Sequence, residues 1–463
     1  MTVNTGMNNI PEQFNFVDQL FKQADLSRLA VIDNTTTYTY AELQDQVKRL
    51  ANWLVHLGVQ PEQRVAIVLK DSAETAALLL ATVYAGMVAV PLDPRAKVSS
   101  LLYCINHSEC KVVIKEDDLD LPGIQSIDRS LIKYTHDPIS AYASHRDSAC
   151  IFMYTSGTTG HPKAVVHRHA TPYIIGTVTG PWVGYHSEHR TFATAKLFYS
   201  FGMFNLWNTL FANACVVLTP GIFIPSSIAK LLIEHKVSLT VSIPVLYSKL
   251  SEQNLAGNSL QHSLSGADRL TQTIYNKWLD ATGVQLRNLY GSTEIAAACL
   301  YNSGDSPLHS IGKPVPGHEI DIRDQHLFIK SPTAGLFYWH DKYWSERQFG
   351  EWMPTGDIVE MDKQGNLYFL GRQSDVVKVN GQFVDLAAIE QALLTLPGIQ
   401  ETVVVGKTDA NGHAQLKAYI VPHPDHTVTW EQVKPFVKEY AVIEQIPRTD
   451  NGKIQRYKLR KQM

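Results

Sequence analysis

The stretch from 154 to 164, which reads YTSGTTGHPKA, combines residue types that commonly hold a polyphosphate. Its glycines allow backbone N–H groups to approach phosphate oxygens, its Ser and Thr hydroxyls can donate hydrogen bonds, and Lys163 supplies a positive charge. The apolar run ACIFM at 149–153 predicts a buried strand that opens into this loop. A solvent-exposed polar turn would have the same composition, so the loop by itself leaves both interpretations open.

This loop differs from the common nucleotide-binding loop, in which a Gly, four residues and then Gly-Lys-Ser/Thr open a helix. Here His161 and Pro162 separate Gly160 from Lys163, and Ala164 takes the position of the hydroxyl residue. A phosphate site at this loop would therefore have another architecture.

Three further segments carry side chains suited to a nucleotide. The segment YGSTE at 290–294 offers an aromatic ring for a base and a carboxylate for Mg²⁺, although a turn followed by a helix cap fits it equally. The segment TGD at 355–357 is expected to form a tight turn, and its carboxylate could accept both hydroxyls of a ribose. Lys453 follows an Asp-Asn-Gly turn, where a surface lysine is the simpler interpretation.

Length and composition describe a globular protein with more than one domain. A chain of 463 residues is too long for one ordinary core, and 44% apolar with 18% charged residues is typical of folded proteins. The formal net charge of −3 argues against a dedicated nucleic-acid binder. The five cysteines are scattered without a Cys-x-x-Cys pair, which indicates reduced thiols and no zinc site.

The sequence also argues against a membrane protein. The start MTVNTGMNNIPEQ lacks the basic segment and the apolar core of a signal peptide. The apolar run at 76–92 is interrupted by Thr82, Gly86 and Pro91, and it falls short of the roughly 20 residues that span a bilayer. We therefore expect a cytoplasmic protein that does not associate with membranes.

The first part of the chain alternates between strand and helix patterns. A hydroxyl three residues before Glu42 has the spacing of a capping box, and apolar residues then recur at helical spacing up to Gly58. Short β-branched runs at 64–69 and 88–92 flank an apolar helix, which is the βαβ pattern of a parallel sheet. The same alternation continues, with strands expected at 215–218, 238–243 and 286–290 and a helix at 226–235.

Beyond about residue 310 the pattern changes to short antiparallel strands, expected at 326–330 and 366–370. From Gly371 the sequence predicts a β-ribbon and then a helix from about Leu386 to Leu396. We place a domain boundary here. The fold class is α/β, with a large domain at 1–370 built from parallel-type βαβ subdomains plus a small β-barrel-like part, and a small α+β domain at 371–463.

The order and spacing of the motifs resemble the adenylate-forming superfamily, which comprises acyl- and aryl-CoA ligases, peptide-synthetase adenylation domains and luciferase. The resemblance runs from about Thr37 to the C-terminus. Its motifs are YAGMVAVPLDP (84–94), YTSGTTGHPKAVV (154–166), LYGSTE (289–294), PTGD (354–357), GRQSDVVKVNG (371–381) and PRTDNGKIQR (447–456). Within the superfamily, VVHRHATP and AKLFYSFGMFN are most similar to the benzoate-CoA ligase branch.

The resemblance implies a two-step acid–thiol ligase with a mobile C-terminal domain. A carboxylate attacks the α-phosphate of ATP to give an acyl-adenylate and pyrophosphate, and a thiol then displaces AMP. The implied cofactors are ATP and Mg²⁺. The implied thiol is CoA, or alternatively the phosphopantetheine of a carrier protein that acts in trans. A nucleotide-binding relative that has lost catalysis is a third interpretation.

Residue by residue, the resemblance implies one ATP site from several segments. The β- and γ-phosphates would be bound by Thr155, Ser156, Gly157, Thr158, Thr159, Gly160 and Lys163. Tyr290 would stack on adenine and Thr293 would contact the α-phosphate. Further nucleotide contacts would come from Gly266, Ala267, Gly291 and Ser292. Glu294 would hold Mg²⁺, Asp357 and Arg372 would bind the ribose, and Lys453 would bridge the carboxylate and the α-phosphate.

The acid pocket implied by the resemblance is mostly apolar and aromatic. Its expected residues are Phe198, Tyr199, Phe201, Gly202, Asn205, Ile243, Ser265 and Ile295. Amino-acid-activating relatives usually place an Asp in the segment that matches 198–202, to pair with the substrate ammonium, and FYSFG has none. We therefore expect a flat aromatic or short acid, with Tyr199 available to a ring substituent.

Several positions depart from the superfamily pattern. Ser374 stands where many relatives carry the hinge Asp, and Asp268 stands where Glu is common. The chain is also shorter than relatives between Tyr440 and Pro447, just before the lysine motif. These changes bear on the thiol acceptor and on how Lys453 reaches the site. We expect a monomer or a homodimer.

Overall fold

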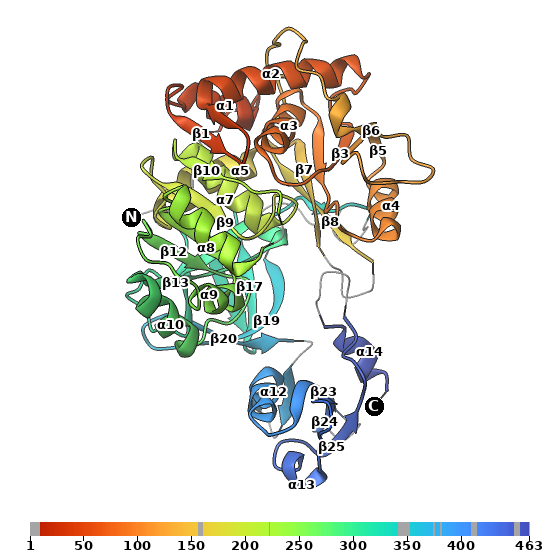
Figure 1. The fold of residues 1–463 in the computed structure, drawn as a ribbon, viewed down its shortest axis with the longest axis vertical. Coiled ribbons are helices and arrows are strands. Elements are labelled where there is room, and N and C mark those ends of the chain that lie inside the picture. The colour runs from red at the N-terminus through yellow and green to blue at the C-terminus, as the bar shows by residue number, and fades with distance from the viewer. Residues whose placement is uncertain are drawn as a thin grey trace. The chain divides into compact units, whose positions relative to one another are not determined.

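The computed structural model describes residues 10–155, 161–221, 223–340, 352–373, 376–379, 382–408, 414–448 and 454–462. The chain divides into two compact units (Figure 1). The first comprises Met1–Glu319 and Lys330–Glu351, and the second comprises Ile320–Ile329 and Trp352–Met463. The domain boundary expected between residues 370 and 371 stays a prediction. Among the described residues, no helix is both long and apolar enough to cross a membrane.

A sheet of the first unit carries the phosphate-loop segment. Its strands, in spatial order, are β18 (Phe337–Tyr338), β8 (Lys163–Arg168), β7 (Ala149–Thr155), β4 (Val88–Pro91), β3 (Arg64–Val68), β5 (Cys110–Lys115) and β6 (Ile127–Asp128). The strands from β7 to β6 are parallel, whereas β8 and β18 join antiparallel. Helix α3 (Ala73–Tyr84) connects β3 to β4, and this confirms the predicted βαβ unit.

A second array of strands in the first unit carries the YGSTE segment. Its members, in spatial order, are β15 (Ser310–Pro314), β14 (Ala297–Tyr301), β13 (Leu286–Ser292), β12 (His262–Ser265), β11 (Leu239–Ser242), β9 (Arg190–Ala193), β10 (Cys215–Val217), β1 (Leu29–Ile32) and β2 (Thr37–Thr39). The strands from β13 to β1 are parallel. The intervening helices are α7 (Ser200–Phe211), α8 (Pro225–Glu234), α9 (Pro244–Leu250) and α10 (Gln272–Thr282). Strands β10, β11 and β13 confirm those predicted at 215–218, 238–243 and 286–290, and α8 confirms the helix predicted at 226–235.

The first unit has a large apolar core beneath its helices. Helix α2 (Tyr40–His56) begins at the predicted capping box, in which Glu42 N–H donates to Thr39 Oγ1 (3.2 Å) and Thr39 N–H donates to the Glu42 carboxylate (2.7 Å). Leu43 and Val47 are fully buried. Helices α1 (Phe16–Gln23), α2 and α3 lie together in Figure 1, and α3 packs against both of the others.

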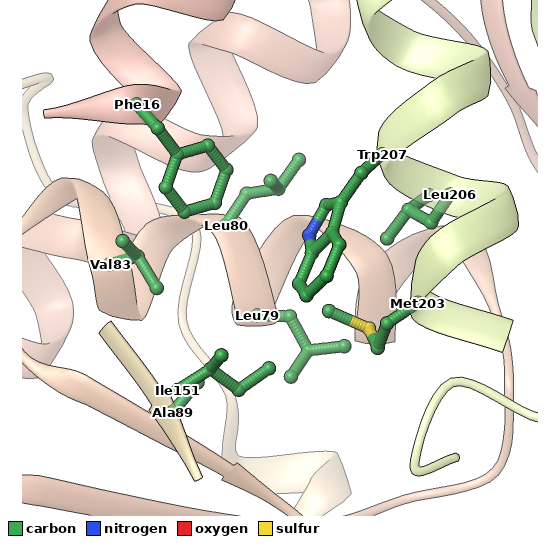
Figure 2. Close-up of a pocket in the computed structure, with 9 residues that line it drawn as sticks. All are labelled: Phe16, Leu79, Leu80, Val83, Ala89, Ile151, Met203, Leu206 and Trp207. Atoms are coloured by element: carbon green, nitrogen blue, oxygen red, sulfur yellow. The ribbon is translucent and has the colours of Figure 1, made fainter. Parts of the chain in front are cut away.

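A small apolar cavity lies in this core (Figure 2). Leu79 and Val83 of α3 line it together with Met203 and Trp207 of α7. Its volume is about 10 Å³. A water molecule needs roughly 10–15 Å³ and two to four polar partners, so this apolar space is a packing gap and not a ligand site.

The second unit consists of two parts. In the first part the strand order is β16 (Glu319–Arg323), β17 (His326–Lys330), β19 (Met353–Met361) and β20 (Leu367–Arg372). The hairpin β21 (Val376–Val379) and β22 (Gln382–Asp385) follows, then α12 (Leu386–Leu394) and a sheet of β23 (Ile399–Thr408), β24 (Ala414–Pro422) and β25 (Glu439–Val442), with short helices α13 (Trp430–Val433) and α14 (Arg456–Arg460). The sheet of the second part is mixed, because β23 and β24 are antiparallel and β24 and β25 are parallel. The predicted ribbon and helix are confirmed, and the β-barrel-like part stays a prediction.

Candidate active site

The phosphate-loop segment forms the tip of the β7–β8 hairpin. Thr155 pairs directly with Lys163 across the two strands, so the loop starts and ends at these residues. Residues 156–160, which are five of the seven predicted phosphate contacts, lie outside the described residues. On the returning arm, the His161 ring stacks on Tyr103 of α4 (Val98–His107), with the ring centroids 4.8 Å apart.

The YGSTE segment leaves its strand through an irregular turn. The register of β13 and β14 shifts between Tyr290 and Gly291, which marks a β-bulge. Thr293–Ile295 then form one 3₁₀ turn, and Ala296 adopts φ 57° to let the chain reverse into β14. The turn Thr293–Ile295, which contains Glu294, is the acidic turn of this site. Next to it, Tyr290 and Ser292 are half-buried and Gly291 is exposed.

Three contacts hold the acidic turn in place. His167 Nε2 lies 2.9 Å from the backbone oxygen of Thr293, and the Thr293 hydroxyl lies 3.1 Å from the Ser200 hydroxyl. The Gly335 N–H donates to the backbone oxygen of Glu294 at 2.8 Å. The contacts come from β8, from the first residue of α7 and from the segment before β18, so three separate elements fix the positions of Thr293 and Glu294.

Tyr338 joins the two predicted motifs of the site. Its hydroxyl donates to Glu294 Oε1 at 2.5 Å, and the Lys163 ammonium lies 5.1 Å from the centroid of its ring. Strand β18 pairs with β8 so that Tyr338 is opposite Val165. The structure thus brings together Lys163, Thr293 and Glu294, which the sequence assigned to one site.

His167 is a neutral side chain within this cluster. It is fully buried, and burial lowers the pKa of its ring to about 4, against a smaller raising effect of the Thr293 hydrogen bond and the Glu294 charge. A carbonyl oxygen can only accept, so the ring donates to Thr293 through Nε2. This hydrogen bond ties the His167 ring to the backbone of the acidic turn.

No site role was predicted from the sequence for Tyr338 or His167. His167 lies in VVHRHATP, a segment used only for resemblance, and Tyr338 lies in the aromatic run LFYWH at 336–340. An aromatic run by itself usually indicates core packing, so only the strand pairing reveals the contact between Tyr338 and Glu294.

The candidate acid-binding residues gather around the start of α7. Phe198 and Tyr199 precede the helix, with Phe198 buried and Tyr199 39% exposed. Gly266 packs so closely that a Cβ there would lie 3.0 Å from the Phe201 ring. Since Ser200 contacts Thr293, the start of α7 connects the candidate acid-binding residues with the acidic turn. Ile243, Ser265 and Ile295 lie at the ends of β11, of β12 and in the 3₁₀ turn.

Two of the predicted acid-binding residues, Asn205 and Ser265, are buried within the protein. Asn205 is 1% exposed, its oxygen accepts from the Tyr185 hydroxyl at 2.9 Å and its amide reaches Thr191 at 3.3 Å. Ser265 is fully buried, and its hydroxyl has no hydrogen-bond partner among the described residues. Ala267, a predicted nucleotide contact, is exposed and adopts φ 65°.

The segment before α7 is held by contacts with Asp71 and Thr219. Asp71 Oδ1 accepts the Leu197 N–H at 3.1 Å, and Lys196 donates to the Thr219 oxygen while its ammonium lies 4.2 Å from the Phe223 ring centroid. Lys196 is 3% exposed, so it does not project toward a ligand. Burial raises the pKa of Asp71 to about 6, although the charge of Lys196 opposes the shift.

The predicted ribose contacts form a pair within the second unit. Asp357 and Arg372 are opposite each other on β19 and β20, and Arg372 Nε lies 2.9 Å from Asp357 Oδ1. Asp357 is 2% exposed, and its N–H donates to Thr355 Oγ1 at 3.1 Å. Lys453 and the hinge position Ser374 lie outside the described residues.

The residues present fit a magnesium ion that binds together with a nucleotide. The described residues contain no group of three His, Cys, Asp or Glu that could hold a metal by itself. Mg²⁺ is typically bound by one or two carboxylates together with substrate phosphates, and Glu294 offers such a carboxylate beside the lysine of the phosphate loop.

Comparisons with known proteins give the family of this chain. Residues 19–334 match the family model described as AMP-binding enzyme, and residues 388–453 match the AMP-binding enzyme C-terminal domain. The 3-hydroxybenzoate–CoA ligase of Aromatoleum sp. (strain CIB) is 27% identical, over 93% of this chain and 92% of that protein.

Two solved structures are similar over nearly their whole length. The benzoate CoA ligase from Burkholderia xenovorans LB400 is 27% identical with a TM-score of 0.82, over 96% of this chain and 100% of that one. The anthranilate CoA ligase AuaEII in complex with anthranoyl-AMP is 26% identical with a TM-score of 0.84, over 98% of both chains. With the family model covering residues 19–334, this chain belongs to the AMP-binding enzyme family.

Proposed function

We propose that this chain is an acid–thiol ligase that activates an aromatic carboxylic acid with ATP and transfers the acyl group to CoA. The observation that carries this proposal is the cluster of Lys163, Tyr338 and Glu294, with Thr293 beside them. It places a cation for phosphates, a carboxylate for a divalent metal and a hydroxyl donor next to the candidate acid pocket.

The first step joins two anions, so it needs charge neutralisation and alignment more than proton transfer. Lys163 would offset the charge of the departing phosphates, and the Thr293 hydroxyl would donate to the α-phosphate. Glu294 would hold Mg²⁺, which supplies positive charge at the phosphates. Within the proposal, Tyr290 stacks on adenine, Asp357 and Arg372 bind the ribose, and Lys453 contacts both the acid and the α-phosphate.

The surroundings of the candidate pocket favour an aromatic acid. Phe198, Tyr199 and Phe201 supply flat apolar surface, and Arg95 lies over the Phe198 ring at 5.8 Å. Lys196 is engaged with Thr219 and Phe223, so it does not serve as a counter-ion to a second substrate charge. The relatives named for 3-hydroxybenzoate, benzoate and anthranilate act on acids of this class. Tyr199 can reach a ring substituent.

The thiol acceptor is tested by one comparison. The enzyme, ATP and an aromatic acid are incubated with CoA or with a panel of carrier proteins that bear phosphopantetheine, and AMP release and thioester formation are measured. We expect an aryl-CoA product and CoA-dependent AMP release. AMP release that only a carrier protein accelerates would favour the second function, a stand-alone adenylation enzyme that loads a carrier in trans.

We further propose a domain organisation, an oligomeric state and a cellular location for this enzyme. The chain has a large domain at 1–370 and a small domain at 371–463, and the small domain rotates near residues 371–375 to carry Lys453 away before thiolation. The enzyme acts as a monomer or a homodimer. It works in the cytoplasm.

A further inference from the structure

Tyr338 contacts both Lys163 and Glu294. These two residues come from motifs more than 100 positions apart in the sequence. The hydroxyl of Tyr338 contacts one of them and its ring contacts the other. Because the two contacts use different parts of one side chain, the hydroxyl contact can be removed while the ring contact stays.

Backbone pairing holds Tyr338 in place whatever its side chain does. Strand β18 is antiparallel to β8, the Leu336 N–H donates to the Val166 oxygen at 2.8 Å and the Trp339 N–H donates to the Ala164 oxygen at 2.9 Å. The approach of the two segments is close, because a Cβ on Gly335 would lie 2.5 Å from Val165 Cγ1. A change confined to the Tyr338 side chain therefore leaves the strand in place.

The hydroxyl contact fixes one carboxylate oxygen of Glu294. A hydrogen bond from a phenol to an ionised carboxylate is among the stronger ones, and it selects one side-chain rotamer. Each carboxylate oxygen has two lone pairs, so Oε2 and the second lone pair of Oε1 keep their capacity for a metal. The hydroxyl thus fixes where Glu294 presents its remaining lone pairs.

The ring contact acts on Lys163. An ammonium within about 6 Å of an aromatic centroid is attracted by the negative face of the ring. This attraction limits the positions of a long, flexible side chain, so less conformational entropy is lost when a phosphate binds.

We propose that Tyr338 is a positioning residue of the nucleotide site, whose hydroxyl orients Glu294 for Mg²⁺ and whose ring holds Lys163 for the phosphates. This inference rests on the proposed function, because it takes ATP as the ligand. Its consequence is a split in which the hydroxyl matters only when Mg²⁺ is present and the ring matters with and without it.

Equilibrium dialysis of ATP in EDTA and in a series of Mg²⁺ concentrations tests this split without any turnover. The variants are Tyr338→Phe, which removes the hydroxyl, and Tyr338→Leu, which removes hydroxyl and ring. Phe337→Leu on the same strand is the matched control, because Phe337 packs on the Trp339 ring and has no role in the proposed site. Thermal unfolding of each variant reports on folding.

In EDTA we expect Tyr338→Phe to bind ATP as the wild type does. With the metal present, it should bind ATP about tenfold more weakly, or need about tenfold more Mg²⁺ for half-saturation. Tyr338→Leu should lose affinity in both conditions, and Phe337→Leu in neither.

Wild-type Mg²⁺ dependence in Tyr338→Phe, or an equal loss with and without metal, would overturn the inference. A wild-type protein that binds ATP but forms no adenylate with any acid would refute the proposed function and leave the assignment of Tyr338 standing.

Discussion

Asp71 Oδ1 accepts a hydrogen bond from the backbone N–H of Leu197 at 3.1 Å. This contact links two segments of the first unit. One is the loop after β3, a strand of the sheet that carries the phosphate-loop segment. The other leads from β9, a strand of the other sheet, into α7. Leu197 directly precedes Phe198 and Tyr199, the first of the candidate acid-binding residues. A buried carboxylate therefore helps to set the position of one wall of the proposed pocket.

Asp71→Asn is expected to change how stability depends on pH. Folding raises the pKa of Asp71 from 3.8 to about 6, so the wild type loses stability as the pH rises through that interval. The loss from this one group between pH 4.5 and 7.5 is about 2 kcal/mol. Asparagine keeps an oxygen for Leu197 and cannot ionise. Its free energy of unfolding, relative to the wild type, should therefore rise by about that amount over this range.

Denaturant unfolding at several pH values measures this change. Asp71→Ala serves as the comparison, since it also cannot ionise but lacks the acceptor, and it should be less stable than Asp71→Asn by about 1–3 kcal/mol at every pH. A stability difference between Asp71→Asn and the wild type that stays constant from pH 4.5 to 7.5 would contradict the assignment. Lys196, Arg95 and Asp93 are the charged groups near Asp71, and all three stay unchanged in this experiment.

His169→Asn is expected to reduce the acid sensitivity of the fold. His169 is fully buried, and burial lowers its pKa to about 3. Because the folded pKa is below the unfolded value of 6.5, stability is lost as the pH falls below 6.5. Between pH 7.5 and 5 the loss from this one group is about 2 kcal/mol. The variant should show a correspondingly smaller drop in unfolding free energy, whatever its stability at pH 7.5.

The control for this prediction is His309→Asn, because His309 is exposed on the surface. It should unfold with the wild-type pH dependence. Equal pH slopes for His169→Asn and the wild type would show that His169 is not buried as a neutral ring.

Gly202→Ala is expected to disrupt the start of α7. A Cβ at this position would lie 2.1 Å from the Lys196 oxygen and 2.7 Å from the Ala195 oxygen, and a backbone cannot yield as a flexible side chain can. We expect a loss of about 1–3 kcal/mol in stability. The KM for the acid should rise relative to the wild type, and it should rise more than the KM for ATP. Gly221→Ala is the control, because only a Thr219 hydroxyl lies near it, at 3.7 Å. Equal KM values in wild type and Gly202→Ala would contradict the placement of the acid beside α7.

Asp357→Asn tests the proposed ribose contact. The buried Asp357 carboxylate, paired with Arg372 at 2.9 Å, can accept from the 2′- and 3′-hydroxyls, and an amide would accept more weakly. The wild type should prefer ATP over 2′,3′-dideoxy-ATP by about tenfold or more, and the variant should lose most of this preference. Glu360→Gln, exposed on the same strand, is the control. An unchanged preference in Asp357→Asn would exclude the ribose role.

Local patterns in the sequence were enough to predict the elements that carry the site. Thr39 and Glu42 predicted a capping box that the structure has, and the β-branched runs at 64–69 and 88–92 became neighbouring parallel strands. These signals depend on residues only a few positions apart. The motif residues Lys163 and Glu294 could be assigned to one site only through the resemblance to the adenylate-forming superfamily, because each motif by itself also fits an ordinary turn.

What the sequence could not predict is which residues meet across separate elements. Tyr338 is 44 positions from Glu294 and contacts it only because β18 pairs with β8. Asn205 was expected to contact the acid, but the rotation of α7 buries it against Tyr185, so its contact with substrate stays a prediction. Helix rotation and strand pairing depend on the whole core, which no local spacing encodes.

The central claim is that the site forms an acyl-adenylate from ATP and an aromatic acid. Acid-dependent exchange of labelled pyrophosphate into ATP tests it most directly, because exchange requires the reversible first step and no thiol. The account predicts exchange with benzoates and hydroxybenzoates, much less with amino acids, and loss of exchange in Lys453→Ala at nearly unchanged ATP affinity. Absence of exchange across benzoates, heteroaryl acids, short fatty acids and amino acids, or exchange with amino acids alone, would contradict it.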